Sequence, residues 1–464
     1  MNELNIPDTW AQACIDKIFE INPRNNLDDS LEVSFVPMGT VNQYTAKIES
    51  EESRPWAKAK KGYTHFKDGD IIFAKITPCM ENKKSSLCEG LRNGHGVGST
   101  EFHVLRPPDG VHGKFVLNFV RADFFIKEAA NNMKGSAGQK RVPKNWIAGQ
   151  VFPIPPFKEQ VRIVQKIDSC FEKINETEQN LTQVETLLSK YRESLLTKAF
   201  RGELVEQVDI DEPASALLDK IRVERESNQK DKKKKQEFAP ISDEEKPFDI
   251  PESWEWVRLG ELLTVSSGKM LSAKNQKGGE VPVYGGNGIT GYHDVSNLED
   301  SVIIIGRVGA KCGVVHITEK KSWVTDNALI VSFNKKIFDM NFLAELLSFL
   351  NLNQLSNSSA QPVISGEKIY RALVALPPIR EQSRIIGAIR DQLDVCNQVQ
   401  KDIGEKFNLC SSLKESVLSK AFQGEFVEQI PSEGTGQQLL DKIFQEKEKN
   451  KPQKKSKNRA KKNK

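Results

Sequence analysis

The sequence PPFKEQVRIV begins at Pro155, and a near copy of it, PPIREQSRII, begins at Pro377. The similarity continues without a gap at an offset of 222 residues, so that LTKAFRGELVEQ, ending at Gln207, aligns with LSKAFQGEFVEQ, ending at Gln429. Over residues 155–207, 21 of the 53 aligned positions are identical. Internal similarity of this length predicts that one structural element occurs twice in the chain.

The repeat divides the rest of the chain. LLDKI occurs at both 217 and 439, a lysine-rich stretch follows each copy, and IPDTW near the start resembles IPESW from Ile250. Between these starts and the Pro-Pro segments the two halves hardly match. We therefore predict four segments: a first head at 1–154, a repeated arm and linker at 155–245, a second head at 246–376, and a second arm with a basic tail at 377–464.

Each arm has the hydrophobic spacing of a coiled coil. One row of the first arm is Ile167, Ile174, Leu181, Leu188 and Leu195, and a second row is Ile163, Cys170, Thr177, Val184 and Tyr191. The second arm has Ile389, Cys396, Ile403, Cys410 and Val417, with Val399 and Leu413 beside them and polar residues at Gln392 and Lys406. Seven-residue rows predict helices of about 40 residues, roughly 60 Å long, that end before Gly202 and Gly424.

We expect the two arms to pack on each other as an antiparallel coiled coil, because a single such helix cannot bury its apolar stripe alone. The alternative, two unrelated core helices, is disfavoured by the gapless repeat.

The heads contain both predicted strands and predicted helices. The predicted strands are GDIIFAKI from Gly69, EFHVLRP from Glu101, VIIIGRVG from Val302 and ALIVSF from Ala328. Predicted helices are KFVLNFVRADFFIKEAANNM from Lys114 and FLAELLSFLNLNQL from Phe342. The fold class is therefore mixed α/β, with two globular heads, two long helices and a pseudo-two-fold repeat.

Composition bounds the function. The 464 residues are 38% hydrophobic and 28% charged, which is typical of globular domains. No apolar run is long enough for a membrane span and the start does not resemble a signal peptide, so we expect a cytoplasmic protein without a membrane partner. The seven cysteines form no Cys-x-x-Cys pair, which argues against a disulfide scaffold and against a zinc site.

Local charge is more informative than the net charge of +4. Residues 1–52 have ten acidic and three basic side chains, whereas residues 54–150 have eight acidic and seventeen basic ones. From Glu446 to Lys464 there are ten basic residues and two acidic ones. A basic segment of this kind is what a phosphate-binding surface requires, although a mixed, solvated surface would give the same counts.

We find no catalytic motif in the sequence. GHGVGS around Gly94 is followed by a predicted strand, not by the helix of a dinucleotide site, and GSAGQKR from Gly135 lacks the Gly-Lys-Ser/Thr end of a P-loop. Ile154 precedes Pro155-Pro156-Phe157 where amino-methyltransferases have a polar residue, and the six histidines have no metal-spaced partners. We therefore predict no catalytic residue and no metal site in this chain.

Several polar and basic side chains are instead suited to binding nucleic acid. Lysine and arginine neutralise phosphates, and asparagine, glutamine and arginine can pair with base edges. In the first head the candidates are Lys75, Thr77, Asn82, Lys83, Lys84, Lys134, Gln139, Lys140, Arg141 and Lys144. In the second head they are Asn287, Tyr292, Arg307, Lys311, Asn327, Gln361 and Lys368.

With its repeated arms and unlike heads, the sequence resembles the specificity subunits of type I DNA restriction–modification enzymes. The resemblance covers nearly the whole chain. The arm segments are its most specific part, and FAKITPCMENKK from Phe73, GSTEFHVLRP from Gly98, GRVGAKCG from Gly306 and WVTDNALIV from Trp323 are similar to segments of that family's target recognition domains.

The resemblance implies a non-catalytic chain that recognises a two-part site in double-stranded DNA. It implies two methyltransferase (modification) subunits that use S-adenosylmethionine, and restriction (motor–nuclease) subunits that use ATP and Mg²⁺. Like arms suit two copies of one partner, and we assign the partner-subunit interface to residues shared by the arms: Glu159, Gln160, Phe200, Gly202, Glu381, Gln382, Phe422 and Gly424.

Two other classes of function remain as alternatives. One is a coiled-coil structural adaptor with two protein-binding heads. The other is a self-contained methyltransferase or nuclease, which the missing cofactor and metal motifs disfavour.

Overall fold

The computed structural model describes residues 5–136, 138–227, 238–309, 312–355 and 363–449. The chain forms two compact units. Unit 1 consists of Met1–Thr182 and Gly404–Lys464, and unit 2 consists of Gln183–Ile403. Each unit thus contains one head, the beginning of one long helix and the end of the other.

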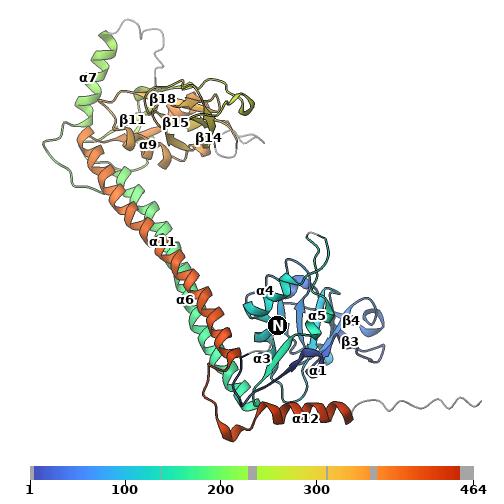
Figure 1. The fold of residues 1–464 in the computed structure, drawn as a ribbon. Helices are drawn as coiled ribbons and strands as arrows, with labels where there is room; N and C mark the ends of the chain where they lie inside the picture. Colours follow the sequence, from blue (N-terminus) through green and yellow to red (C-terminus); the bar gives the residue numbers. More distant parts are fainter. Residues whose placement is uncertain (1–4, 137, 228–237, 310–311, 356–362, 450–464) are drawn as a thin grey trace, which may run out of the picture. The chain divides into compact units, whose positions relative to one another are not determined.

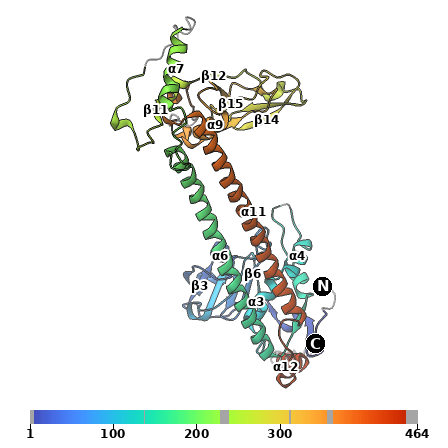
Figure 2. The ribbon, with the colours of Figure 1, turned by 90° about the vertical axis from the view of Figure 1, so that its left-hand side faces the viewer.

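The two arms are long helices, as predicted. They are α6 (Phe157–Arg201) and α11 (Ile379–Gln423), each 45 residues long. Each helix starts directly after a Pro-Pro pair and stops before a glycine with positive φ, +78° at Gly202 and +76° at Gly424. In both units the parts of α6 and α11 lie side by side and run antiparallel (Figures 1 and 2).

Only one of the predicted hydrophobic rows on α6 is buried along its length. Its members from Ile167 to Leu195 are buried or half-buried, and so is the row of α11 from Ile389 to Val417. In the second row of α6, Thr177, Val184 and Tyr191 are exposed, so the prediction of two apolar rows is wrong at these positions.

Polar side chains join the helices beside the buried row. In unit 1, Lys414 Nζ donates to both carboxylate oxygens of Glu178, at 2.8 and 2.9 Å. In unit 2, Gln400 donates to Glu185 at 2.9 Å, and the hydroxyl of Tyr191 donates to Gln392 at 2.9 Å. The polar seam position at Gln392 is therefore satisfied by a partner on the other helix, not left unpaired.

The first head consists of two four-stranded sheets and a closing strand pair. One sheet has the order β2-β9-β6-β7 and the other the order β4-β3-β8-β5. Their strands are β2 (Glu20–Ile21), β3 (Glu32–Val36), β4 (Glu52–Pro55), β5 (Thr64–Lys67), β6 (Ile71–Ala74), β7 (Ser85–Leu87), β8 (His95–Gly98) and β9 (Phe102–Arg106). The helices are α1 (Ile15–Ile18), α2 (Trp56–Ala59), α3 (Gly113–Arg121), α4 (Asp123–Asn131) and α5 (Lys144–Ala148).

The second head repeats this plan, with fewer strands among its described residues. Its sheets have the orders β12-β18-β15-β16 and β14-β13-β17. The strands are β12 (Leu263–Ser267), β13 (Val281–Gly285), β14 (Gly288–His293), β15 (Ile303–Gly306), β16 (Val315–Ile317), β17 (Trp323–Val324) and β18 (Ala328–Phe333). The helices are α8 (Leu259–Leu262), α9 (Met340–Phe349) and α10 (Gly366–Arg371).

Each head is closed by an antiparallel pair of its first and last strands. These are β1 (Ala11–Cys14) with β10 (Val151–Ile154), and β11 (Glu255–Arg258) with β19 (Leu373–Leu376). Two shorter helices follow the arms, α7 (Ala214–Ser227) and α12 (Gly436–Lys449). None of the helices in the described part of the chain is both long and apolar enough to span a bilayer.

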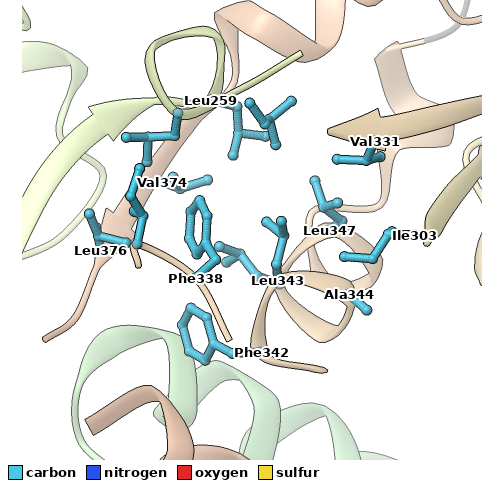
Figure 3. Close-up of a cluster of buried hydrophobic side chains, with 14 of the residues drawn as sticks. Leu259, Ile303, Val331, Phe338, Phe342, Leu343, Ala344, Leu347, Val374 and Leu376 are labelled. Carbon is cyan, nitrogen blue, oxygen red and sulfur yellow. The ribbon is translucent and has the colours of Figure 1, made fainter. Parts of the chain in front are cut away.

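Each unit has one large hydrophobic core that joins a head to the arms. In unit 2, Phe338, Phe342 and Leu343 converge with Leu259, and side chains of strands β15, β18 and β19 complete the cluster (Figure 3). This core also includes Phe200 and Ile385 from the two long helices. The core of unit 1 is its counterpart, with aromatic rings of α3 and α4 packed against Phe422.

The four predicted strands are confirmed as β6, β9, β15 and β18. The single helix expected from Lys114 is instead two helices, because Ala122 has extended backbone angles, φ −66° and ψ 140°, that end α3 and begin α4. The helix expected from Phe342 is α9 followed by a short 3-10 turn at Leu352–Leu355.

Candidate nucleic-acid interface

Both heads build the same backbone junction at the end of a central strand. After β6 the N–H of Lys75 donates to the carbonyl of Glu101 at 2.9 Å, and after β15 the N–H of Arg307 donates to the carbonyl of Asn327, also at 2.9 Å. The carbonyls of Lys75 and Arg307 in turn accept the N–H of Val142 (2.8 Å) and Ile364 (3.0 Å), respectively. We call these two places the head junctions. A basic residue stands at the same position in each.

The junction of the first head brings together two basic segments that are far apart in the sequence. The N–H of Thr77 donates to the carbonyl of Lys140 at 3.1 Å, and the N–H of Lys140 donates to the Thr77 hydroxyl at 3.2 Å. Lys134 and Arg141 exchange two backbone hydrogen bonds, at 2.8 and 2.9 Å. The candidate residues at 75–77 and 134–141 therefore form one surface.

The charged groups of this surface differ in exposure and in whether a carboxylate already neutralises them. Lys134, Gln139, Lys140 and Lys144 are exposed. Arg141 donates from Nε and Nη2 to the Glu101 carboxylate, both at 2.9 Å. This hydrogen-bonded pair lowers the pKa of Glu101 and raises that of Arg141. Because Glu101 neutralises it, Arg141 is better placed to hold the junction together than to bind DNA.

The neighbouring candidates at 82–84 are partly engaged inside the head. Asn82 is exposed, but Lys83 forms an ion pair with Asp123, and the Lys84 ammonium donates to the carbonyl of Met38 at 3.1 Å. Their backbone lies next to the junction, since the N–H of Ala74 donates to the carbonyl of Lys84 at 2.8 Å. Lys83 and Lys84 thus fix the shape of this loop, and the charge of Lys83 is paired with Asp123.

The second head gathers three of its candidates at its junction. A Cβ on Gly286 would lie 3.1 Å from the Asn327 carbonyl oxygen, so the β13–β14 turn that carries Asn287 is packed against Asn327 and Arg307. Arg307 Nη1 also donates to the Ser267 hydroxyl at 3.4 Å. Tyr292 is half-exposed further along β14, and Lys368 lies on α10. Lys311 and Gln361 lie outside the described residues.

Sequence reasoning missed one exposed aromatic residue of the first head. Tyr44 has 83% of its side-chain surface exposed, in the connection between β3 and β4. A tyrosine among polar residues gives no sequence signal for exposure, because its neighbours Gln43 and Thr45 are equally compatible with a packed ring. Only the structure distinguishes these cases.

The residues assigned to a partner interface form two matched clusters inside the chain. In unit 1 the Trp10 Nε1 and Gln429 Nε2 atoms donate to Oε1 of Glu159, at 2.9 and 2.7 Å. In unit 2 Trp254 and Gln207 donate in the same way to Glu381, at 3.0 and 2.7 Å. We call these the Trp–Glu–Gln clusters. Each joins the start of a head to the beginning of one arm and the end of the other.

The adjacent glutamines are used equally in both units. Gln160 accepts the N–H of His112 at 2.8 Å and donates to the carbonyl of Pro155 at 2.9 Å. Gln382 accepts the N–H of Asp339 at 2.9 Å and donates to the carbonyl of Pro377 at 3.1 Å. In each unit the glutamine side chain therefore satisfies a backbone N–H of the head and the backbone carbonyl of the first proline before the arm helix.

Close packing explains the two glycines. A Cβ on Gly424 would lie 2.2 Å from a Pro7 side-chain carbon, and one on Gly202 would lie 2.5 Å from Pro251. Both positions also have positive φ, which favours glycine. The proline of each IPxxW segment thus packs directly on the glycine that ends an arm helix.

The assignment of these eight residues to a partner interface is therefore corrected. Glu159, Gln160, Phe200, Glu381, Gln382 and Phe422 are at most 3% exposed, and the two glycines are covered by proline rings. Their repetition reflects the need to close each unit, because the same intramolecular contacts occur twice. Among the described residues, no three His, Cys, Asp or Glu side chains are grouped as metal ligands would be.

Comparison with known proteins identifies the family. The family model of the type I restriction modification DNA specificity domain matches residues 7–186 and 251–408. The chain is 31% identical over 466 residues to the EcoAI type I restriction enzyme specificity subunit of Escherichia coli, covering 85% of this chain and 79% of that protein. Two solved structures have a similar fold. One comes from a study of complex assembly and conformational transition of the type I R-M system, with a TM-score of 0.66, 20% identity and coverage of 92% of this chain and 100% of that one.

The other is the HsdS subunit from Thermoanaerobacter tengcongensis, with a TM-score of 0.58 and 19% identity, covering 90% of this chain and 98% of that one. The mixed α/β heads, the paired long helices and the repeated arm sequence agree with these similarities. The family model, which matches both halves of the chain, and the 31% identical relative show that this protein belongs to the family of type I restriction–modification specificity subunits.

Proposed function

We propose that this chain is the non-catalytic subunit that selects the DNA site of a type I restriction–modification complex. Each head recognises one half of a two-part site in double-stranded DNA, and the bases between the halves are not specified. The observation that carries this proposal is the head junction. Two heads with little sequence similarity keep the same backbone hydrogen bonds and a basic residue there, while the side chains around it differ. A constant frame with variable side chains suits two different target sequences.

The same frame accounts for the division of labour that we propose within a head. Exposed lysines around the first junction, Lys134, Lys140 and Lys144, would neutralise phosphates and set the register of the head on DNA. Around the second junction, Asn287 and Asn327 each have a donor and an acceptor for a base edge, and Arg307 has paired donors. The engaged side chains, Arg141 above all, would act by holding the junction in shape.

We propose that two methyltransferase subunits bind the arms. Leu187 and Leu409 occupy equivalent positions of the repeat and are 63% and 51% exposed, and the next equivalent pair, Tyr191 and Leu413, is 46% and 45% exposed. Apolar residues that are exposed in both copies favour a protein partner that binds twice. Leu187 and Tyr191 lie in unit 2, and Leu409 and Leu413 lie in unit 1.

The catalytic chemistry would then belong to the partners. The methyltransferase subunits would use S-adenosylmethionine to methylate adenine in the site, and restriction subunits would use ATP and Mg²⁺ for motor and nuclease activity. This chain would bind none of these cofactors itself. Its contribution would be the choice of site and the attachment of the subunits.

The salt dependence of DNA binding tests this function. We expect the double variant Lys140→Ala/Lys144→Ala, assembled with its methyltransferase subunits, to bind its DNA more weakly. The slope of log affinity against log salt should fall by about 0.9 for each phosphate contact that is lost. The measurement is a titration of a fluorescent duplex containing the methylated site at several salt concentrations.

The control is Lys58→Ala/Lys61→Ala, which removes the same charge from other exposed positions of the same head. Equal slopes for parent and junction variant would exclude the junction from the interface. A complex that binds no DNA at any salt concentration would favour the structural adaptor.

A further inference from the structure

The first head has a loop that the second head lacks. In the second head, β13 and β14 form a tight hairpin in which Gly285 pairs with Gly288. In the first head the equivalent strands are β3 and β4, which pair from Phe35 with Glu52, so residues 37–51 form the connection. We call residues 37–51 the β3–β4 loop. It is an addition to the shared plan of the heads.

The β3–β4 loop has a defined conformation. Val41 is fully buried, and Met38 and Ile48 pack on the same small core. The Asn42 side-chain oxygen accepts the N–H groups of Tyr44 and Thr45, at 2.7 and 3.0 Å, which fixes the turn at the tip. At this tip the Tyr44 ring is 83% exposed, the largest exposure of any large hydrophobic side chain in the described part of the chain.

A half-buried arginine, Arg121, connects the tip to the segment next to the head junction. Arg121 Nη2 donates to the carbonyl of Gln43 at 2.8 Å, while its Nη1 donates to the carbonyl of Lys83 at 2.7 Å and to the Ser85 hydroxyl at 3.1 Å. These oxygen atoms are uncharged, and burial lowers the pKa of Arg121 to about 10. The three hydrogen bonds of Arg121 join the tip of the loop to Lys83 and Ser85 and so specify where the loop lies.

The loop lies on the junction side of the head. Val36 at the end of β3 pairs with Gly98, three residues before Glu101, and Tyr284 at the end of β13 pairs with Val324, three residues before Asn327. The β3–β4 loop therefore starts where the Asn287 turn starts in the second head. The hydrogen bond from Lys84 to the carbonyl of Met38, at 3.1 Å, ties its first turn to the segment that leaves the junction.

We propose that Tyr44 is a DNA-contacting, specificity-determining residue of the first head, presented by the β3–β4 loop and positioned by Arg121. This inference rests on the proposed DNA-recognition function. A tyrosine ring on a rigid loop can pack on sugars and on thymine methyl groups, and its hydroxyl can bond with phosphate or base acceptors. The second head has a short turn carrying Asn287 at this place, so the two heads would recognise their half-sites by different contacts.

The test compares Tyr44→Ala and Tyr44→Phe with the parent, each assembled with its methyltransferase subunits. The methylated site is first mapped in the genome of cells that express the parent system. A duplex with that site and a duplex of unrelated sequence then serve as probes. We expect Tyr44→Ala to lose about tenfold in affinity for the site, similar to the effect of one mismatched base pair in a specific duplex site. Tyr44→Phe should retain part of the affinity, because it keeps the ring.

The matched control is Ile210→Ala, which removes another side chain of similar exposure, 81%, in unit 2 and outside the heads. If Tyr44→Ala binds the site as the parent does, the proposal is wrong. It is also wrong if Tyr44→Ala impairs assembly with the methyltransferase subunits but leaves DNA affinity unchanged. A parent that shows no preference for its mapped site would instead overturn the proposed function, so the two failures are distinguishable.

Arg121→Lys tests the positioning role. Lysine keeps the positive charge but cannot reach the carbonyls of Gln43 and Lys83 with two separate nitrogens. We expect Arg121→Lys to weaken specific binding only when Tyr44 is present, so that the double variant is no weaker than Tyr44→Ala alone. Strictly additive effects of the two substitutions would contradict this role.

Discussion

At the scale of single residues, Glu159 and Glu381 have the clearest physical consequence. Burial raises the pKa of both carboxyl groups, and the hydrogen bonds from tryptophan and glutamine only partly oppose it. When the pKa of a carboxyl group is higher in the folded state, the group stabilises the folded state at pH values below its ordinary pKa of 4.5. This contribution is lost as the pH rises through the folded-state pKa, because the charged form is then buried.

We therefore predict that Glu159→Gln becomes more stable relative to the parent as the pH rises above 4.5. Glutamine can accept the same two hydrogen bonds without carrying a charge. Urea unfolding midpoints of variant and parent, measured from pH 4.5 to pH 8, give the difference directly. Glu381→Gln should behave alike, since its cluster has the same geometry in the other unit. A difference that does not change with pH would contradict the burial argument.

These residues also show what the sequence could not reveal. Identity between the arms marked Glu159 and Glu381 as important, but identity does not distinguish an internal contact from an external one. Their hydrogen-bond donors come from Trp10 and Gln429 in one unit, and these are far away in the chain. The surface location of the exposed lysines could be predicted from the sequence, because charged side chains are usually exposed. The pairing of Arg141 with Glu101 could not be predicted, since the two residues are forty positions apart in the sequence.

At the scale of elements, the glycines of the long helices give a sharp contrast. Gly202 and Gly424 have positive φ and face proline rings, whereas a Cβ added to Gly387 or Gly404, within α11, would have nothing within 4 Å. We predict that Gly202→Ala or Gly424→Ala lowers the unfolding free energy by about 2–4 kcal/mol, through backbone strain and overpacking.

The controls Gly387→Ala and Gly404→Ala should raise the unfolding free energy by about 0.5–1 kcal/mol, because alanine is the better helix former. Chemical denaturation followed by circular dichroism measures all four variants. If the helix-end variants were as stable as the parent, the IPxxW proline would not pack on the arm as described.

The elements themselves were largely predictable from periodicity and terminating residues. Both arm helices, their ends and the strands β6, β9, β15 and β18 follow from the spacing of apolar residues. The exposure of the second row of α6 could not be predicted from this spacing. A packed pair of helices can replace apolar contacts by polar ones such as Glu178–Lys414. The strand order of the heads also could not be predicted, since it depends on pairings such as Phe35 with Val97 between distant segments.

At the scale of the whole molecule, each unit is completed by a segment from the far arm. The sequence shows which segments are alike, but not which of them touch. Gln429 follows the second head yet hydrogen-bonds Glu159 after the first, because antiparallel pairing returns the end of one arm to the start of the other. The predicted domain limits divide the chain in sequence order, so they do not show that each unit contains parts of both arms.

This arrangement suggests how heads could be exchanged. We predict that replacing residues 15–150 with the same part of a relative changes one half of the recognised DNA site and preserves the other. Trp10 and the β1–β10 pair remain, so unit 1 can still close on the arms. Mapping methylated sites in cells that express the hybrid measures the outcome.

Replacing residues 259–372 in the same way should change only the other half-site. This second exchange is the matched control, because it leaves Trp254 and the β11–β19 pair in place. A hybrid in which both halves of the site change at once would refute independent recognition by the heads.

The hydrophobic core of unit 1 has a consequence for synthesis on the ribosome. The first head is made before the second, but its core includes Phe422, Leu440 and Ile443, which are made after the second head. Unit 2 is continuous from Gln183 to Ile403 and has all its packing partners once that stretch has left the exit tunnel. Translation therefore delivers the complete partners of the second head before those of the first. Until those partners are made, the first head depends on its own local contacts to keep its apolar surface from aggregating.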